Sequence, residues 1–189
     1  MDRTLSPQAL TCRWLCGLAL LVMSIGCGGG TLGQELRTTH YANGQLWSEL
    51  SYADGLPNGT WRTWYSSGQL KSEGTYRLGR QTGVWRSFAP SGAPEMEASY
   101  DADEPHGSWT FWSGGRRVEA GAYDRGRRHG VWKVWFEDGK PRSETTFDQG
   151  REAGPAKAGY PGGSPRSEGF FEAGSRTGSW TFWLSLIHI

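Results

Sequence analysis

Small or apolar residues alternate with polar ones along residues 70–76. Every second position carries a small or apolar side chain, at Leu70, Ser72, Gly74 and Tyr76, and polar residues fill the positions between. A period of two is typical of a β-strand with one buried face. Residues 84–89 predict a second strand, and the glycine-bearing stretch 77–83 between them predicts a turn. This part of the chain therefore predicts one β-hairpin.

The same pattern recurs six times between His40 and Trp183, about every 24 residues. One glycine column comprises Gly44, Gly68, Gly92, Gly115, Gly139 and Gly163, with steps of 24, 24, 23, 24 and 24. A second comprises Gly59, Gly83, Gly107, Gly130, Gly154 and Gly178. An aromatic column comprises Tyr52, Tyr76, Tyr100, Tyr123, Phe147 and Phe171. Such a period indicates a repeat array in which each unit contacts its neighbours.

Residues 40–183 therefore predict an all-β fold, an elongated array of about six antiparallel β-hairpins that form a single twisted sheet. Dipeptides favoured in tight turns support this prediction, and they occur at Asn43-Gly44, Asp54-Gly55, Asn58-Gly59 and Asp138-Gly139. Asn58-Gly59-Thr60 also spells a glycosylation sequon, but we interpret Asn58-Gly59 as the turn that closes a hairpin.

Two aromatic residues recur three positions apart in most repeats, so a regular strand directs them to opposite faces of the sheet. The first column, Trp61, Trp85, Trp109, Trp132 and Trp180, is expected to pack with the tyrosine column as a structural spine. The second column is Trp64, Phe88, Trp112, Trp135 and Trp183. It is the candidate binding strip, with structural packing as the alternative explanation.

Charged columns accompany the aromatic ones. Glutamates recur at Glu49, Glu73, Glu97, Glu144 and Glu168, with Ala120 interrupting, and basic residues recur at Arg62, Arg86, Lys133 and Lys157. Paired strands would join these columns by ion pairs that keep the sheet soluble and in register. The fifth repeat lacks the aromatic pair, having Ala156 and Gly159 in its place, and Pro155 discourages an interior strand. It predicts a flexible joint.

Composition excludes several function classes. Without residues 1–26 the chain holds 18 basic and 18 acidic residues, so it has no electrostatic footprint for nucleic acid. The three cysteines, Cys12, Cys16 and Cys27, all precede the repeats, which excludes a disulfide framework or a cysteine metal site there. His106 and His129 are expected in equivalent turns, and the cluster of Arg125, Arg127 and Arg128 in a solvated loop. We therefore predict no enzyme, no catalytic residue, no metal and no cofactor.

The N-terminal segment predicts export. Residues 1–26 combine Arg3 and Arg13 with a short apolar stretch, as in a signal peptide. Small residues before Cys27 resemble the lipobox of bacterial lipoproteins, which implies that Cys27 is acylated and that residues 27–39 comprise the lipidated cysteine and a flexible tether. The glycine after Cys27 implies sorting to the outer membrane of the bacterial envelope. An ordinary signal peptide and an uncleaved anchor are the alternatives.

The C-terminal hexamer 184–189 breaks the repeat phase directly after Trp183. It matches the translation of a transposase mosaic end used in sequencing libraries, so we expect it to be a sequencing-adapter artefact. On this interpretation the natural chain continues beyond Trp183. A genuine apolar terminal strand is the alternative.

Several motifs resemble MORN repeats, in particular the variant repeats of bacterial antitoxin-like proteins of the YwqK type. They are Tyr123-x-x-Gly126-x-x-His129-Gly130-Val131-Trp132, His106-Gly107-Ser108-Trp109 after Tyr100, and Trp135-Phe136-x-x-Gly139-x-x-x-x-Glu144. The resemblance implies an elongated array of β-hairpins that serves mainly for protein interaction, with lipid contact proposed for some members. It implies no general catalytic residue.

Three functions follow as hypotheses. The favoured one is a non-catalytic, lipid-anchored envelope scaffold that binds an unknown protein partner through its sheet. The first alternative is a module for cell-wall glycan or peptidoglycan, with the exposed aromatic strip stacking on sugar rings. The second is an antitoxin-like repeat protein, an activity that fits poorly with export because a toxin of this kind is cytoplasmic.

Overall fold

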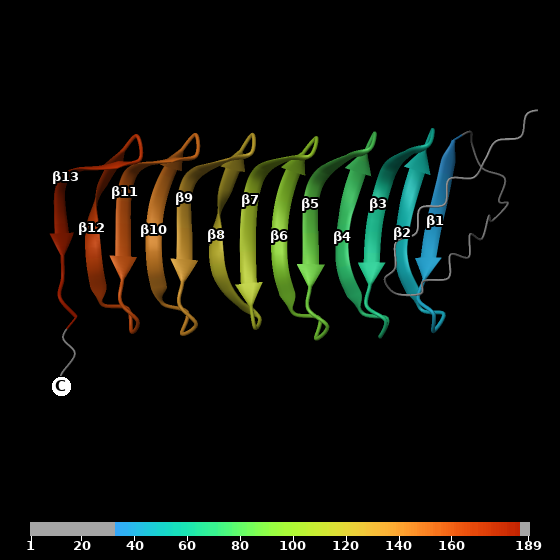
Figure 1. Ribbon diagram of the computed structural model, residues 1–189, viewed down its shortest axis with the longest axis horizontal. Coiled ribbons are helices and arrows are strands. Elements are labelled where there is room, and N and C mark those ends of the chain that lie inside the picture. Colours follow the sequence, from blue (N-terminus) through green and yellow to red (C-terminus); the bar gives the residue numbers. More distant parts are fainter. Residues whose placement is uncertain (1–32, 186–189) are drawn as a thin grey trace, which may run out of the picture.

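A computed structural model describes residues 33–185, which form one antiparallel sheet and no helix. Each strand pairs with its neighbours in the chain, and the first and last strands do not meet, so the sheet is open (Figure 1). The strands are β1 (Gln34–His40), β2 (Leu46–Ala53), β3 (Leu56–Trp64), β4 (Leu70–Arg77), β5 (Arg80–Phe88), β6 (Pro94–Asp101), β7 (Glu104–Ser113), β8 (Arg116–Asp124), β9 (Arg127–Trp135), β10 (Pro141–Asp148), β11 (Arg151–Gly159), β12 (Pro165–Glu172) and β13 (Ser175–Phe182).

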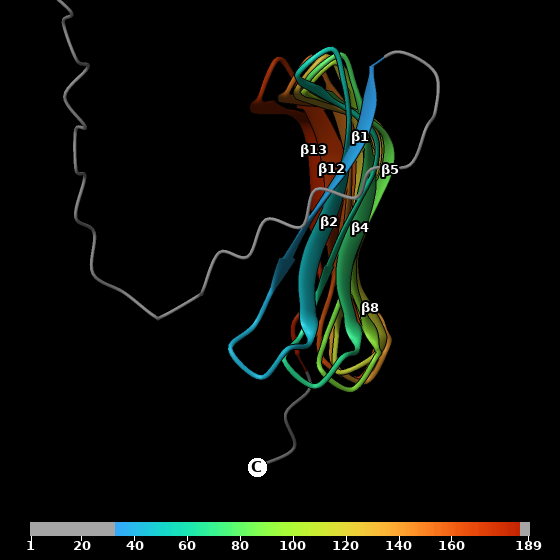
Figure 2. The same cartoon turned by 90° about the vertical axis from the view of Figure 1, so that its right-hand side faces the viewer.

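The predicted all-β hairpin array is confirmed, with one strand more than six hairpins need. The extra strand, β1, occupies Gln34–His40 and pairs with β2, so the prediction of a tether through residue 39 is wrong for that stretch. Seen along the row of strands in Figure 2, the sheet is a single thin layer whose strands rotate gradually. This rotation is the ordinary right-handed twist of β-strands.

Tight turns connect the strands at one end of the sheet. Both central residues have positive φ, as a type I′ hairpin requires, in the pairs Asp54-Gly55, Leu78-Gly79, Ala102-Asp103, Arg125-Gly126, Gln149-Gly150 and Ala173-Gly174. Each turn also bonds to the preceding repeat, as when Gly79 N–H donates to the Pro57 carbonyl at 2.7 Å. The turns thus extend the backbone ladder from repeat to repeat.

Longer loops connect the strands at the opposite end. In the loop Tyr65 to Gln69, the Tyr65 N–H donates to the Gln69 carbonyl and the Gly68 N–H donates back to the Tyr65 carbonyl, both at 2.8 Å. The fourth repeat instead turns through Gly114 and Gly115, with φ of 57° and 75°. This shorter turn explains the single step of 23 residues in the glycine column.

The second glycine column lies inside strands and not in turns. Leu50 pairs with Trp61 and Tyr52 with Pro57, so Ser51 faces the three residues Asn58 to Thr60 in a bulge. Gly59 has a φ of 116° there, a conformation that side chains rarely adopt. The predicted Asn58-Gly59 turn is therefore wrong, because glycine at positive φ serves bulges as well as turns.

Two further local predictions fail for the same reason. His106 lies in β7 and His129 in β9, each directly before the bulge glycine of its strand, and neither lies in a turn. In the fifth repeat, Pro155 lies in the equivalent bulge of β11, which pairs with β10 on both sides of the bulge and with β12 through Pro155 itself. A bulge already interrupts the ladder, so proline is tolerated in this interior strand.

Candidate functional site

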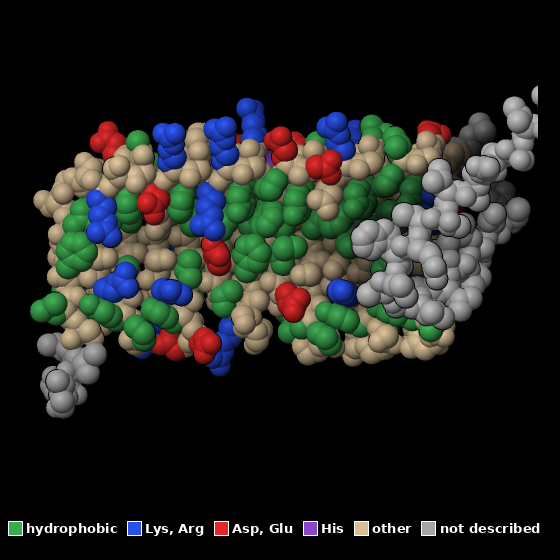
Figure 3. All heavy atoms as spheres, viewed as in Figure 1, with side chains coloured by type: hydrophobic (Ala, Val, Ile, Leu, Met, Phe, Trp, Pro, Cys, Tyr) green, Lys and Arg blue, Asp and Glu red, His purple; other side chains and the backbone are tan. Residues whose placement is uncertain are grey.

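Rings of the first aromatic column and of the tyrosine column contact one another on one face, from Trp61 to Phe147 and again at Phe171 and Trp180. Tyr76 and Trp85 have centroids 5.1 Å apart, Trp109 and Tyr123 4.9 Å, and Tyr123 and Trp132 5.1 Å, mostly in edge or tilted arrangements. Such contacts stabilise beyond the area they bury. Figure 3 shows a band of hydrophobic side chains that crosses successive strands. The predicted structural spine matches this arrangement.

Tryptophan rings in the spine lie flat on the preceding strand. A Cβ added at Gly74 would overlap the Trp85 ring, and the same holds for Gly121 beneath Trp132. Trp85 and Trp132 are only 6% and 2% exposed. The Trp132 Nε1–H donates to the Ala122 carbonyl at 3.0 Å, which anchors the ring. A single-layer sheet thus buries apolar side chains, because the rings of Trp85 and Trp132 each cover the preceding strand.

The spine is interrupted in the fifth repeat. Trp132 reaches Phe147 at 6.5 Å and Phe171 reaches Trp180 at 5.1 Å, but among the described residues no ring contact joins Phe147 to Phe171. Ala156, which replaces the tryptophan, is buried against the facing strands. The backbone ladder is continuous here while the side-chain stack is not, and the predicted flexibility of this repeat stays a prediction.

The opposite face carries the ladder of ion pairs. Arg62 contacts Glu49 at 3.1 Å and Glu73 at 3.7 Å, and Arg86 contacts Glu73 at 3.5 Å and Glu97 at 2.8 Å. The hydrogen bond that Arg86 donates to Glu97 raises the pKa of Arg86 above its ordinary value, and Glu73 adds to this effect. These side chains are partly exposed, so each pair contributes little stability. The predicted cross-strand pairing is confirmed for these residues.

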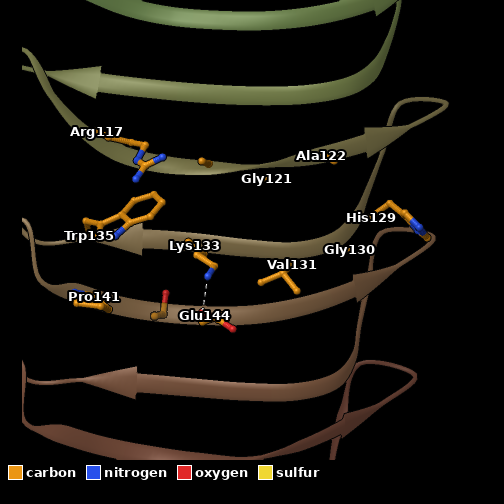
Figure 4. Close-up of a pocket in the computed structure, with 12 residues that line it drawn as sticks. Arg117, Gly121, Ala122, His129, Gly130, Val131, Lys133, Trp135, Pro141 and Glu144 are labelled. Carbon is orange, nitrogen blue, oxygen red and sulfur yellow. Dashed lines mark ion pairs between the residues drawn. The ribbon is translucent and has the colours of Figure 1, made fainter.

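The second aromatic column lies on the same face as the ion pairs, and all its members are half-buried. Trp135 shares a hollow of about 640 Å³ with Lys133 and Val131 of β9 (Figure 4). Arg117 of β8 lies over the Trp135 ring, 4.4 Å from its centroid. Trp112 lines a second hollow of about 400 Å³ beside Glu95. The candidate strip is therefore a row of accessible rings set among charges.

Trp183 is the one member of the strip that lies outside a strand, directly after β13. Its N–H still donates to the Arg166 carbonyl at 3.0 Å, which extends the ladder by one residue.

Three tyrosines that join neighbouring repeats were not found by sequence reasoning. Their hydroxyls donate to carbonyls in the next repeat: Tyr41 to Trp64 at 2.8 Å, Tyr65 to Phe88 at 2.8 Å, and Tyr160 to Trp183 at 2.9 Å. The signal was their recurrence one position after the second aromatic column, where Tyr65 follows Trp64 and Tyr160 follows Gly159. They hold the backbone of the candidate strip in place.

The arginine cluster is also ordered differently from the prediction. Arg125 lies in a tight turn, but Arg127 and Arg128 belong to β9. The Arg128 guanidinium lies 4.1 Å from the Trp132 ring centroid and 2.9 Å from a Glu119 oxygen. Arg128 therefore caps the spine and is not part of a solvated loop.

The two histidines each face one carboxylate. His106 Nδ1 is 3.4 Å from an Asp124 oxygen and His129 Nδ1 is 3.6 Å from an Asp148 oxygen. Within residues 33–185, no three His, Cys, Asp or Glu side chains gather in a way that could hold a metal ion. The same residues include no helix long and apolar enough to cross a membrane.

Comparison with known families accounts for the repeats. The family described as MORN repeat variant matches residues 36–54, 57–77 and 128–149. These stretches coincide with β1 to β2, β3 to β4 and β9 to β10, each a pair of strands joined by a longer loop. The chain therefore contains MORN repeats in these three stretches. MORN repeats are generally modules for interaction with proteins or membranes, which directs attention to the sheet faces.

Solved structures give only weak likenesses to this MORN array. A mutant of S. aureus TarM in complex with Fondaparinux, alpha-GlcNAc-glycerol and UDP is 14% identical, with a TM-score of 0.32. A second TarM structure is 15% identical, with a TM-score of 0.31. Each match covers 47% of this chain and 18% of the TarM chain. No match was found among curated proteins.

Proposed function

We propose that the protein is a non-catalytic scaffold of the bacterial cell envelope, anchored by a lipid on Cys27, whose MORN sheet binds another protein. The predictions of export, of lipidation at Cys27 and of sorting to the outer membrane rest on residues 1–32, which lie outside the described residues. The proposal of protein binding comes from the sheet itself. MORN repeats generally serve interaction, and here we assign the binding to one face of the sheet, the face that carries the second aromatic column and the ion pairs.

The observation that carries this proposal is the half-buried aromatic row on the charged face. Trp64, Phe88, Trp112 and Trp135 occupy equivalent positions in four successive repeats. Tryptophan and arginine dominate the binding energy of protein interfaces, and here Arg117 lies directly over Trp135. An open sheet leaves this row accessible along several repeats, as repeat proteins use their extended surfaces.

Affinity capture from an envelope extract tests the proposal. The immobilised chain is compared with the double variant Trp112→Ala/Trp135→Ala, and circular dichroism checks that the variant keeps its sheet. We expect one reproducible partner that the wild type retains and the double variant loses at least tenfold, as for removal of two central aromatic anchors. Leu78→Ala is the matched control, since Leu78 is exposed in a tight turn where Ala102 occurs naturally.

Other outcomes of the capture decide against the proposal. Retention of the partner by the double variant would move the binding site away from the strip. Capture of cell-wall material alone would favour the glycan-binding alternative.

Lipid anchoring needs its own measurement. Cells that express the chain or its Cys27→Ser variant are labelled with palmitate, and the purified proteins are compared. We expect label on the wild type only. Equal label on the variant would exclude Cys27 as the acylation site.

A further inference from the structure

The hollow of Figure 4 lies where the ladder of ion pairs is interrupted. Ala120 of β8 pairs with Thr110 of β7 and Lys133 of β9, in the column that elsewhere carries glutamate. Ala122 likewise stands where the first three repeats have Ser51, Thr75 and Ser99. Two truncated side chains therefore open a groove across β8 to β10, bounded by Trp135 at one end and His129 at the other (Figure 4).

The groove carries more positive charge than the rest of the ladder. Arg62 and Arg86 each contact two glutamates, whereas Lys133 contacts one carboxylate among residues 33–185, that of Glu144 at 3.0 Å. Arg117 has no carboxylate of the described residues within 4 Å and rests on the Trp135 ring. The charges of Lys133 and Glu144 cancel, so the net charge of these three residues is the positive charge of Arg117. On its other side, Lys133 is paired with Ala120, which has no carboxylate.

Part of the groove is apolar, beside the polar lining from His129, Ser143 and Glu144. Ala120, Ala122, Val131 and Pro141 line it, and Val131 is 44% exposed. A ligand that fits must therefore combine an aliphatic group with a carboxylate. The guanidinium of Arg117 matches a carboxylate in a two-point hydrogen-bonded pair.

We propose that this groove binds an acidic, aliphatic segment of the partner protein. A carboxylate of that segment would lie against Arg117 and Lys133, and an aliphatic side chain would cover Ala120 and Val131. The inference rests on the proposed function and names the chemistry of its partner. A sugar ring fits less well, because Arg117 already covers one face of Trp135, the face on which a sugar would stack.

Fluorescence anisotropy with a defined probe tests the inference. The probe is a fluorescein-labelled peptide of eight residues in which Glu and Leu alternate, measured against the full chain at low ionic strength. A second peptide replaces every Glu with Gln. We expect the acidic peptide to bind at least tenfold more tightly than the neutral one, because a charge-assisted contact is stronger than its neutral counterpart.

Two variants place this binding in the groove. Ala120→Glu restores the residue found at the same column in five other repeats, so the sheet is expected to tolerate it. The new carboxylate would pair with Lys133, fill the groove and lower acidic-peptide affinity at least tenfold. Arg117→Gln removes the open charge and is expected to lower affinity about tenfold. Arg80→Gln, in an exposed position next to a tight turn, is the matched control and should bind as the wild type does.

The outcomes separate this inference from the proposed function. Equal binding of the two peptides, or unchanged binding by both groove variants, would overturn it. Stronger displacement of the probe by a uronic-acid oligosaccharide than by unlabelled peptide would also overturn it, in favour of an anionic sugar. If Ala120→Glu still captures the envelope partner while Trp112→Ala/Trp135→Ala does not, the scaffold function stands and the acidic-segment site is wrong.

Discussion

Gly74 shows how a single residue without a side chain supports this fold. The Trp85 ring occupies the space that a Cβ at residue 74 would need. Ala98 occupies the equivalent position two strands later, and its partner Trp109 is less buried than Trp85. The size of this one residue therefore sets how closely a tryptophan approaches the sheet.

We expect Gly74→Ala to lower the free energy of unfolding by about 1–3 kcal/mol, because the added methyl group displaces the Trp85 ring from a packed position. Urea denaturation followed by tryptophan fluorescence measures the change. Thr75→Ala, at the exposed neighbouring position, is the control and should change stability by no more than about 0.5 kcal/mol. Equal stability of Gly74→Ala and the wild type would contradict the close approach of the ring.

At the scale of the strand pair, three tryptophans lie over a residue that has no side chain. Trp85, Trp132 and Trp180 lie over glycines, whereas Ala156 faces the larger Thr145. In the fifth repeat the larger residue, Thr145, lies on the first strand and the small residue, Ala156, on the second, which reverses the arrangement of these three tryptophans and their glycines. Its strand persists because backbone pairing with β10 and β12 does not depend on the missing ring.

A double-mutant cycle tests this matching. Ala156→Trp alone is expected to destabilise the sheet, because Thr145 blocks the site where the ring would lie. In combination with Thr145→Gly, the ring can lie flat, so the double variant should be at least about 1 kcal/mol more stable than the sum of the single changes predicts. Urea denaturation of all four proteins gives the coupling energy. Additive changes would show that residues 145 and 156 do not share one packing site.

Across the whole molecule, each repeat contacts only its neighbours, so stability depends on the interfaces between successive repeats. The ring contacts run from Trp61 to Phe147 and resume at Phe171. The two ends of the sheet are therefore not equivalent. Strand β2 pairs directly with β3, where the stack begins at Trp61, whereas the C-terminal hairpin is joined to the stack mainly by backbone hydrogen bonds.

Hydrogen exchange measured by mass spectrometry tests this asymmetry. We expect the amides of β12 to exchange at least tenfold faster than those of β2, although each is the second strand from an edge of the described sheet. The difference should shrink in the Ala156→Trp/Thr145→Gly variant if the ring restores the stack. Equal protection of β2 and β12 in the wild type would mean that the backbone ladder alone couples the repeats.

The sequence by itself determined the repeat, the all-β class, the two aromatic columns and the charged ladder. These features follow from local periods, because alternation along a strand and recurrence every 24 residues need no knowledge of distant contacts. The same patterns did not distinguish a turn glycine from a bulge glycine, as Asn58-Gly59 shows, since that choice depends on the register between strands. They also missed β1, whose residues lack the glycine and the tryptophan of the later repeats and become a strand by pairing with β2.

Only the tertiary structure decided how the columns meet. The hydroxyl of Tyr65 finds the Phe88 carbonyl because the next repeat brings it within reach. Arg128 lies against the Trp132 ring and the Glu119 carboxylate, and not in the turn with Arg125, because strand pairing places these groups beside it. The groove at Ala120 exists because strand pairing places this alanine, where other repeats have glutamate, next to Lys133, and places Arg117 over the Trp135 ring. Each of these features joins residues from different strands, and their distances are set by the register and twist of the sheet.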